Sequence, residues 1–213
     1  ATTSAGVVKC WGDETYGATM PPGESFVSVS ATLHFSCGVL TTGYASCWGT
    51  PGVGGETAAT PPPTSLFTSI ASYTEHSCGV TQSGTVECWG NNDYGQSSPP
   101  AGSYTRVSTG WGFSCAIKDD RTISCWGLDD YNQLAAPTGT FTQISSGWAH
   151  TCAVATSGGI ECWGDGGLNM NYGQNDPDPA FTDTDRDGIM ADAARIAPDG
   201  AAGRRRPRFL PPA

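Results

Sequence analysis

Cysteine is the residue whose number and spacing in this sequence point most clearly to chemistry. Nine cysteines occur in 213 residues, and eight of them form four pairs whose members stand ten residues apart. The pairs are Cys37/Cys47, Cys78/Cys88, Cys115/Cys125 and Cys152/Cys162. If the members of a pair face each other across a hairpin, a three-residue loop remains, and three of the four loops end in glycine, as a type I turn followed by a left-handed residue requires. Directly opposed residues have the Cα separation of a disulfide, so we predict four cross-strand disulfides.

Metal binding is the alternative use of the nine cysteines and three histidines. No C-x-x-C motif occurs, and the pairs belong to separate repeats. His76 and His150 stand two residues before the first cysteine of their pairs, where the other repeats have Phe35 and Phe113. A position that accepts phenylalanine or histidine is a packing position, so the sequence favours disulfides over zinc or an iron–sulfur cluster.

Cys10 is the ninth cysteine and has no counterpart ten residues away in the sequence. The same spacing would place its partner immediately before Ala1, with a loop Ser4-Ala5-Gly6 that again ends in glycine. We therefore expect the sequence to begin inside a hairpin, as a piece of a longer array. The alternative is that Cys10 is a free or intermolecular thiol.

A second candidate metal site lies in an acidic segment near the end of the sequence. Three aspartates alternate before Gly188 and a fourth follows, so the candidate ligands are Asp183, Asp185, Asp187 and Asp192. Carboxylates at this spacing before a glycine can wrap a calcium ion, and the segment resembles a thrombospondin type 3 repeat. The twelfth loop position is alanine rather than glutamate. A solvated acidic linker is the alternative, and we expect no other cofactor.

No set of residues in the sequence is typical of catalysis. We find no nucleophile with a neighbouring base, no recurring pair of carboxylates and no phosphate-binding loop. The aspartate pairs Asp119/Asp120 and Asp129/Asp130 are favoured turn residues, and the glycines of residues 52–55 follow a proline and precede no helix. The sequence therefore predicts that the protein is not an enzyme.

The elements that position the cysteines form a repeat. Cys-Trp-Gly occurs five times, beginning at Cys10, Cys47, Cys88, Cys125 and Cys162, at intervals of 37, 41, 37 and 37 residues. The last four units share an aromatic residue opening a β-branched strand, a second strand with the first cysteine, a turn, and a third strand ending in Cys-Trp-Gly. Each unit is thus predicted to be a small antiparallel meander. The motif tryptophans follow cysteine and face the other side of the strand, so we expect all five to be buried: Trp11, Trp48, Trp89, Trp126 and Trp163.

Composition and charge exclude several classes of protein. Only 14% of the residues are charged while 29 are glycine and 15 proline, which argues against a helical bundle. No apolar run reaches the length of a membrane span. Residues 1–182 contain 15 acidic and 4 basic side chains, a net charge of −11, so nucleic acid is a poor partner for this part of the chain.

Two segments resemble the regulator of chromosome condensation repeat family. They are H-S-C-G-V-T-Q-S-G-T-V-E-C-W-G-N-N-D-Y-G-Q (76–96) and H-T-C-A-V-A-T-S-G-G-I-E-C-W-G (150–164). The similarity is greatest to its short-repeat, cysteine-containing branch of secreted bacterial proteins. This resemblance implies an all-β fold, a β-propeller of short antiparallel blades with one cross-strand disulfide each. About four and a half units are visible, and the family usually has seven blades, so we expect an incomplete ring, a smaller ring or assembly with other chains.

The sequence divides into four regions. Residues 1–175 are predicted to form the propeller domain and residues 176–182, which contain Asp-Pro-Asp-Pro, a linker. The acidic loop that we consider for calcium spans residues 183–194. Residues 195–213 are basic and proline-rich, and we expect them to be a disordered tail.

Aromatic side chains are the candidate binding residues. Inhibitory propellers that resemble this chain grip their targets with aromatic residues on the loops before the second strand of each blade. The corresponding loops here contain Leu33, His34, Tyr73, Trp111 and Trp148, although Trp111 and Trp148 could instead merely cover the blade ends. We expect a secreted or cell-surface protein-binding or adhesion module, because dense disulfides indicate an oxidising compartment. The alternatives are a structural subunit of an extracellular fibre and a protein inhibitor of an extracellular enzyme.

Overall fold

The computed structural model describes residues 1–50 and 58–164, and the following statements concern these residues. The glycine-rich insertion, the expected linker, the candidate calcium ligands Asp183, Asp185, Asp187 and Asp192, and the basic tail lie outside the described residues.

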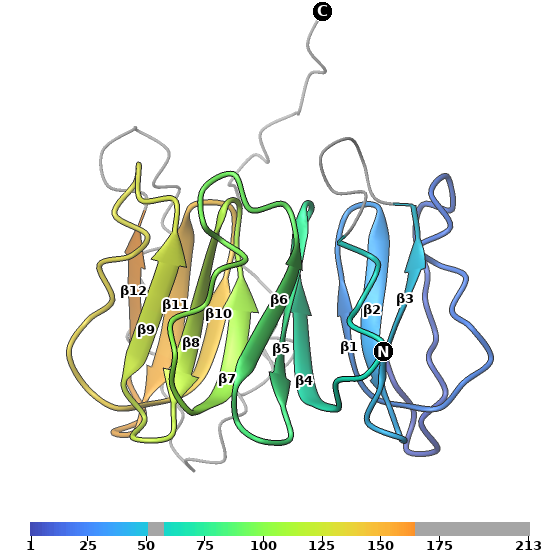
Figure 1. The fold of residues 1–213 in the computed structure, drawn as a ribbon, viewed down its shortest axis with the longest axis horizontal. Helices are drawn as coiled ribbons and strands as arrows, with labels where there is room; N and C mark the ends of the chain where they lie inside the picture. Colours follow the sequence, from blue (N-terminus) through green and yellow to red (C-terminus); the bar gives the residue numbers. More distant parts are fainter. Residues whose placement is uncertain (51–57, 165–213) are drawn as a thin grey trace, which may run out of the picture.

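The described residues form four three-stranded antiparallel sheets, as the repeat predicted (Figure 1). The strands in chain order are β1 (Phe26–Ala31), β2 (Phe35–Leu40), β3 (Ala45–Gly49), β4 (Phe67–Ser72), β5 (His76–Thr81), β6 (Val86–Gly90), β7 (Tyr104–Thr109), β8 (Phe113–Lys118), β9 (Ile123–Gly127), β10 (Phe141–Ser146), β11 (His150–Ala155) and β12 (Ile160–Gly164). Each sheet is a meander of three consecutive strands, with the second strand in the middle. No helix of the described residues is long and apolar enough to cross a membrane. The predicted all-β fold of propeller blades is therefore confirmed.

The four cysteine pairs form the predicted disulfides. Each pair is directly opposed in the register of the second and third strands, and each has a Cα–Cα distance of 4.0 Å. The third loop residue has a positive φ in every hairpin: 93° at Gly43, 85° at Gly84 and 94° at Gly158. Arg121 occupies this position in the third hairpin with a φ of 69°, although a side chain disfavours that conformation.

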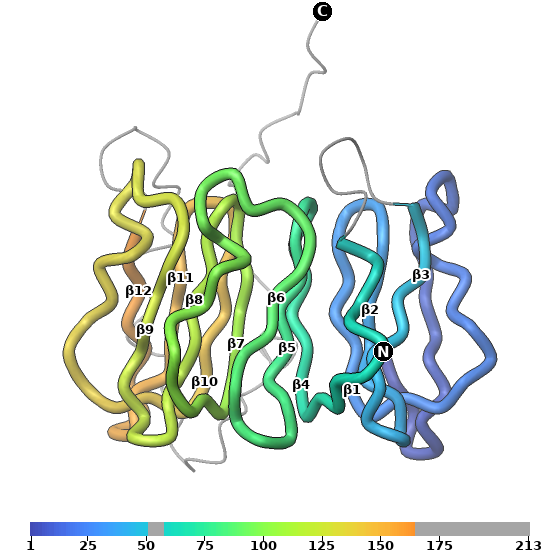
Figure 2. The backbone as a smooth tube through the Cα atoms, in the orientation of Figure 1, coloured from blue at the N-terminus to red at the C-terminus, as the bar shows by residue number. Residues whose placement is uncertain are grey.

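Successive sheets pack face to face, with the disulfide of one sheet against the tryptophan of the next. Cys78 and Val80 of the second sheet share a core cluster with Tyr104 and Trp126 of the third. Equivalent clusters join the first sheet to the second and the third to the fourth. The opening strands β1, β4, β7 and β10 contact one another in turn. The four sheets form an open arc in the described part of the chain, since β1–β3 and β10–β12 do not pack together (Figure 2).

The same hydrogen bond, donated by a buried indole, recurs in all four sheets. Trp48, Trp89, Trp126 and Trp163 are 6–9% exposed, and each donates Nε1–H to a backbone carbonyl 30 or 31 residues earlier. The acceptors are the carbonyls of Ala18, Ala58, Gln96 and Gln133. Sequence spacing thus places these four tryptophans correctly on the face opposite the disulfide.

Trp11 contradicts the prediction that all five motif tryptophans are buried. Its side chain is 78% exposed. The other four lie against a segment about 30 residues earlier, whereas the described residues include no sheet that covers Trp11. Residues 1–10 do form the expected hairpin, with a bridge between Thr2 and Val8 and a φ of 77° at Gly6. Cys10, half-buried, is a free thiol in the structure.

Candidate functional site

Two sets of loops meet at one end of the arc. In a three-stranded meander the first and third strands run in the same direction, so the loop after the first strand and the loop after the third leave at the same edge. This is the upper end in Figure 1, toward which β3, β6, β9 and β12 point. We call it the upper rim, and its loops include residues 32–34, 73–75, 91–97, 110–112, 128–134 and 147–149.

Four aromatic rings on the upper rim form a continuous row of contacts, which we call the aromatic ladder: Tyr94, Trp111, Trp148 and Tyr131. The two indoles come from equivalent loops of neighbouring sheets and lie with centroids 5.6 Å apart and ring planes at 26°. Tyr94 packs on Trp111 with centroids 6.1 Å apart, and Tyr131 packs on Trp148 with centroids 5.4 Å apart. The structure therefore brings together Trp111 and Trp148, which the sequence selected separately.

Backbone hydrogen bonds hold the ladder in place. Trp111 N–H donates to the carbonyl of Trp148 at 3.2 Å, which links two sheets at the base of the stacked indoles. Tyr94 N–H donates to Oε1 of the buried Gln96 at 2.9 Å, and Tyr131 N–H donates to Oε1 of the buried Gln133 at 2.6 Å. The recurring Tyr-Gly-Gln motif is thus a tight turn that its own glutamine closes, and it fixes the backbone of each ladder tyrosine.

The ladder rings are anchored and yet accessible. Trp148 is 39% exposed and Tyr94 is 48% exposed, while Trp111 and Tyr131 are half-buried. Large aromatic side chains that are held by packing and remain partly exposed are the usual anchors of protein interfaces. The rings cover the ends of two blades and also present a surface.

The remaining candidate binding residues lie on the same rim but outside the ladder. Leu33 is 72% exposed, and His34 packs on Tyr16 with centroids 4.2 Å apart. Tyr73 is half-buried, and its burial raises the pKa of its phenol. Tyr73 N–H donates to the carbonyl of His76, and Gly110 N–H donates to the carbonyl of Phe113 in the next sheet. Tyr73 is therefore equivalent to Gly110, and it lies one residue before the position that Trp111 occupies in its own loop.

The sequence-based prediction missed three tyrosines of this rim, Tyr16, Tyr94 and Tyr131. Each follows a Cys-Trp-Gly motif by the same interval and packs on the loop of the next sheet. The recurrence of Tyr-Gly-Gln was visible in the sequence. What it did not show was that one repeat's tyrosine lies beside the aromatic residue of the following repeat.

The upper rim is acidic. Its described loops contain Asp13, Glu14, Glu75, Asp93, Asp129 and Asp130, and no lysine or arginine. Asp129 Oδ1 accepts a hydrogen bond from Leu134 N–H at 2.9 Å, and Asp93 Oδ2 accepts one from Asn91 Nδ2 at 2.9 Å. These carboxylates stay exposed while their loops are ordered by the hydrogen bonds.

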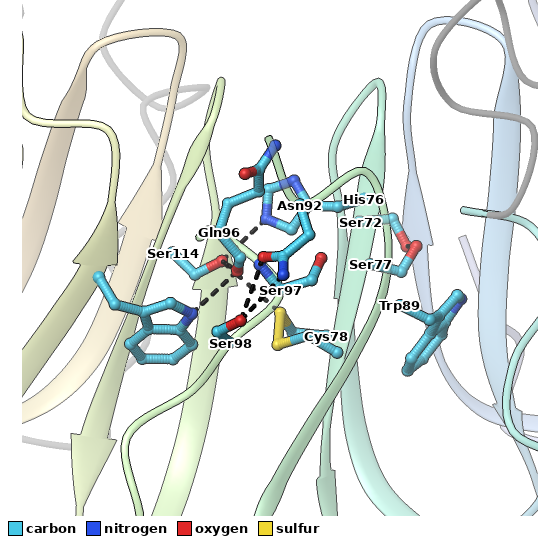
Figure 3. Close-up of a disulfide and its surroundings, with 12 residues drawn as sticks. Ser72, His76, Ser77, Cys78, Trp89, Asn92, Gln96, Ser97, Ser98 and Ser114 are labelled. Carbon is cyan, nitrogen blue, oxygen red and sulfur yellow. Dashed lines mark hydrogen bonds between the residues drawn. A yellow bond between two sulfur atoms is a disulfide. The ribbon is translucent and has the colours of Figure 1, made fainter. Parts of the chain in front are cut away.

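Below the rim, polar side chains cross the sheet junction beside the second disulfide (Figure 3). His76 is 1% exposed, and its Nε2 lies 2.8 Å from Ser114 Oγ of the next sheet. Ser114 Oγ–H donates to the carbonyl of Gln96 at 3.1 Å. Burial lowers the pKa of His76 to about 4, so the imidazole is neutral at physiological pH. His76 is therefore a packing residue, as predicted, and the described residues contain no group of three or more His, Cys, Asp or Glu side chains placed to hold a metal ion.

Comparison with known proteins agrees with this architecture. A model of the Regulator of chromosome condensation (RCC1) repeat matches residues 67–96, 104–133 and 141–174. Each of the last three sheets thus lies in a segment that is similar to an RCC1 repeat. The first sheet lies outside these matches but has the same strand register and disulfide as the three matched repeats. No curated protein matches the sequence.

Solved structures with the same fold include two plant ectodomains. The CRINKLY WD40 ectodomain of the Arabidopsis thaliana receptor kinase ACR4 is 30% identical, with a TM-score of 0.56, and the match covers 67% of this chain and 51% of that chain. The entire ectodomain of the Physcomitrella patens receptor kinase CR4 is 26% identical, with a TM-score of 0.66 and coverage of 76% and 47%. Yeast RCC1 (Prp20), solved with Kap60, shares the fold at 16% identity, with a TM-score of 0.56 and coverage of 68% and 45%. The chain thus spans about half the length of the structures that it matches.

Proposed function

We propose that this chain is a protein-binding module that acts outside the cell or at its surface, and that the aromatic ladder is its contact surface. The observation that carries the proposal is the set of ring contacts among Tyr94, Trp111, Trp148 and Tyr131, which spans the three segments that match the RCC1 repeat. Tryptophan and tyrosine are enriched among the residues that dominate binding energy, and they lose little conformational entropy when already packed.

Two features support an extracellular location. Four disulfides in 213 residues require an oxidising compartment to form and persist. Two of the matched solved structures, at 30% and 26% identity, are ectodomains of receptor kinases. A partner that is an extracellular enzyme would make the chain an inhibitor.

The proposal is tested by selecting peptide ligands from a random displayed library on the wild-type protein. The selected peptides are then measured on Trp111→Ala, on Trp148→Ala and on Tyr44→Ala. Tyr44 is a suitable control because it is 45% exposed and lies in the β2–β3 hairpin at the opposite end of the arc. We expect each tryptophan substitution to weaken binding by more than about 2 kcal/mol if these residues are hot spots, and Tyr44→Ala to leave binding unchanged. Peptides that bind all four proteins equally would refute the proposal.

A second candidate function, assembly end to end into an extracellular fibre, is favoured by apolar side chains at the two ends of the described arc. Val80 and Val86 of the second sheet share a core cluster with Tyr104 and Trp126 of the third. Their counterparts in the fourth sheet, the paired Val154 and Ile160, line an open cavity of about 210 Å³. Trp11 is exposed at the other end of the arc. The end of one copy that carries Trp11 could therefore pack on the end of another copy that carries Val154 and Ile160, as the tryptophan side of one sheet packs on the disulfide side of its neighbour within the chain.

Light scattering over a range of concentrations separates the two candidates. Assembly through the ends of the arc predicts large species in solution. Ile160→Asp and Trp11→Ala should each abolish these species, because each substitution removes an apolar side chain from one of the two contacting ends. A binding module stays discrete at all concentrations. Discrete wild-type particles at high concentration would exclude the fibre.

A further inference from the structure

The charge around the aromatic ladder differs from the charge elsewhere on the molecule. Asp93 directly precedes Tyr94, and Asp129 and Asp130 directly precede Tyr131, so carboxylates border both ends of the stack. All three aspartates are exposed. Glu75 adds a fourth carboxylate on the loop of the neighbouring second sheet.

The basic residues of the described chain lie away from this surface: Lys9, Arg106, Lys118 and Arg121. Lys118 and Arg121 belong to the β8–β9 hairpin, at the end of the third sheet opposite the ladder. Arg106 is paired with Ile117 beside that same hairpin, and Lys9 follows Val8 in the N-terminal hairpin. None of these side chains comes from an upper-rim loop, so the described residues of the rim supply no Lys or Arg to neutralise its carboxylates.

This combination has a defined chemical preference. The face of an indole or phenol ring attracts a cation through its quadrupole, and tryptophan does so most strongly. A guanidinium group also stacks flat on an aromatic ring and pairs with a carboxylate through two parallel hydrogen bonds. Stacked aromatic rings bordered by carboxylates therefore suit arginine better than they suit an apolar or acidic side chain. An acidic surface also repels nucleic acid and anionic membranes, which leaves a basic polypeptide as the complementary macromolecule.

We infer that the partner of the aromatic ladder is a basic protein segment whose arginine or lysine side chains lie on the exposed surface of the ladder rings and pair with Asp93, Asp129 and Asp130. This inference rests on the proposed function, because it names the chemistry of the partner for the same surface. It assigns the rings the role of anchoring the segment and the carboxylates the role of selecting its charge and speeding its approach.

The test uses the full chain and four fluorescent peptides that share a glycine–serine backbone. They carry several arginines, the same number of lysines, the same number of citrullines, or the same number of glutamates. Citrulline keeps the size and planarity of arginine but has no charge. Fluorescence anisotropy at low and high salt gives the affinity of each peptide. We expect the order arginine, lysine, citrulline, glutamate, with a loss of about tenfold from arginine to citrulline and a loss on adding salt.

Two protein variants locate the binding. The triple variant Asp93→Asn, Asp129→Asn, Asp130→Asn removes charge but keeps the side-chain oxygens that accept the loop hydrogen bonds. The matched control is Asp119→Asn with Asp120→Asn, on the hairpin at the opposite end. We expect the triple variant to bind the arginine peptide with about tenfold lower affinity than the wild type and to bind the citrulline peptide with unchanged affinity. The control variant should bind both peptides with the affinity of the wild type. Circular dichroism and thermal melting check that each variant is folded.

The outcomes distinguish this inference from the proposed function. If arginine and citrulline peptides bind equally, or if the triple variant binds the arginine peptide normally, the charge preference is wrong. Neutral peptides from the displayed library that still require Trp111 and Trp148 would then uphold the ladder as a binding surface with a different partner. Self-association of the wild type that Trp111→Ala and Trp148→Ala abolish would show that a second copy occupies the ladder, and would also overturn the inference.

Discussion

The turn that positions each ladder tyrosine depends on a buried glutamine, and the two repeats satisfy that glutamine differently. In the second repeat, Gln96 Nε2 donates to Asn91 Oδ1 at 2.6 Å. In the third repeat Leu128 replaces this asparagine, and Gln133 Nε2 is buried without a hydrogen-bond partner in the described part of the chain. Both glutamine side chains are 0% exposed. We therefore predict that Leu128→Asn stabilises the protein.

The size of the effect follows from two opposing contributions. An unpaired buried amide costs about 1–3 kcal/mol, which the new asparagine oxygen would recover. The substitution removes a half-buried leucine, at a cost of about 1 kcal/mol. The expected net gain is about 1 kcal/mol in the free energy of unfolding, or a rise of about 2–4 °C in Tm for a domain of this size. The reciprocal change Asn91→Leu orphans Gln96 Nε2 and should destabilise by about 1–2 kcal/mol.

Denaturant unfolding followed by tryptophan fluorescence measures both variants, with the slope of the transition checked for constancy because repeat proteins can lose cooperativity. Leu128→Asn should also make the ladder more rigid at Tyr131, since Gln133 Oε1 accepts the hydrogen bond from the backbone N–H of Tyr131. Nuclear magnetic resonance signals of the ladder rings should sharpen in Leu128→Asn. A neutral or destabilising Leu128→Asn together with a neutral Asn91→Leu would show that the glutamine amide has no need of this partner, and would refute the reasoning.

Four further predictions concern the hairpins, the buried histidine and the acidic segment. Arg121→Gly should raise the free energy of unfolding by about 1 kcal/mol, because glycine adopts the left-handed φ of this position without strain; an unchanged denaturation midpoint would contradict this. Intact mass without reductant should be eight hydrogens below the reduced mass, two for each of the four disulfides, and eight additional free thiols would exclude the pairing. His76 has a folded pKa of about 4, below its unfolded value, so the unfolded chain binds the extra proton and stability should fall as the pH drops from about 6.5 to about 4; His76→Phe should flatten that slope in pH-dependent melting. Calcium titration should protect the segment from Asp183 to Asp192 against proteolysis, and unchanged cleavage at millimolar calcium would argue for a plain acidic linker.

Features that depend on short stretches of chain could be predicted from the amino-acid sequence alone. Ten-residue spacing between cysteines, together with glycine at the third loop position, was enough to predict each hairpin, its register and its disulfide. The alternation of side chains along a strand placed Trp48, Trp89, Trp126 and Trp163 opposite the cysteines, since neighbouring residues of a strand face opposite sides. His76 was correctly read as a packing residue because Phe35 and Phe113 occupy the same position.

The contacts between repeats could be known only from the three-dimensional structure. Burial of a motif tryptophan requires a neighbouring sheet, so Trp11 has the same local sequence as the others and is nevertheless exposed. The stacking of Trp111 on Trp148, and of each on a tyrosine from the preceding repeat, depends on the distance and angle at which sheets pack. Those quantities come from the fit of many side chains across each junction, and local spacing along the chain contains no information about them.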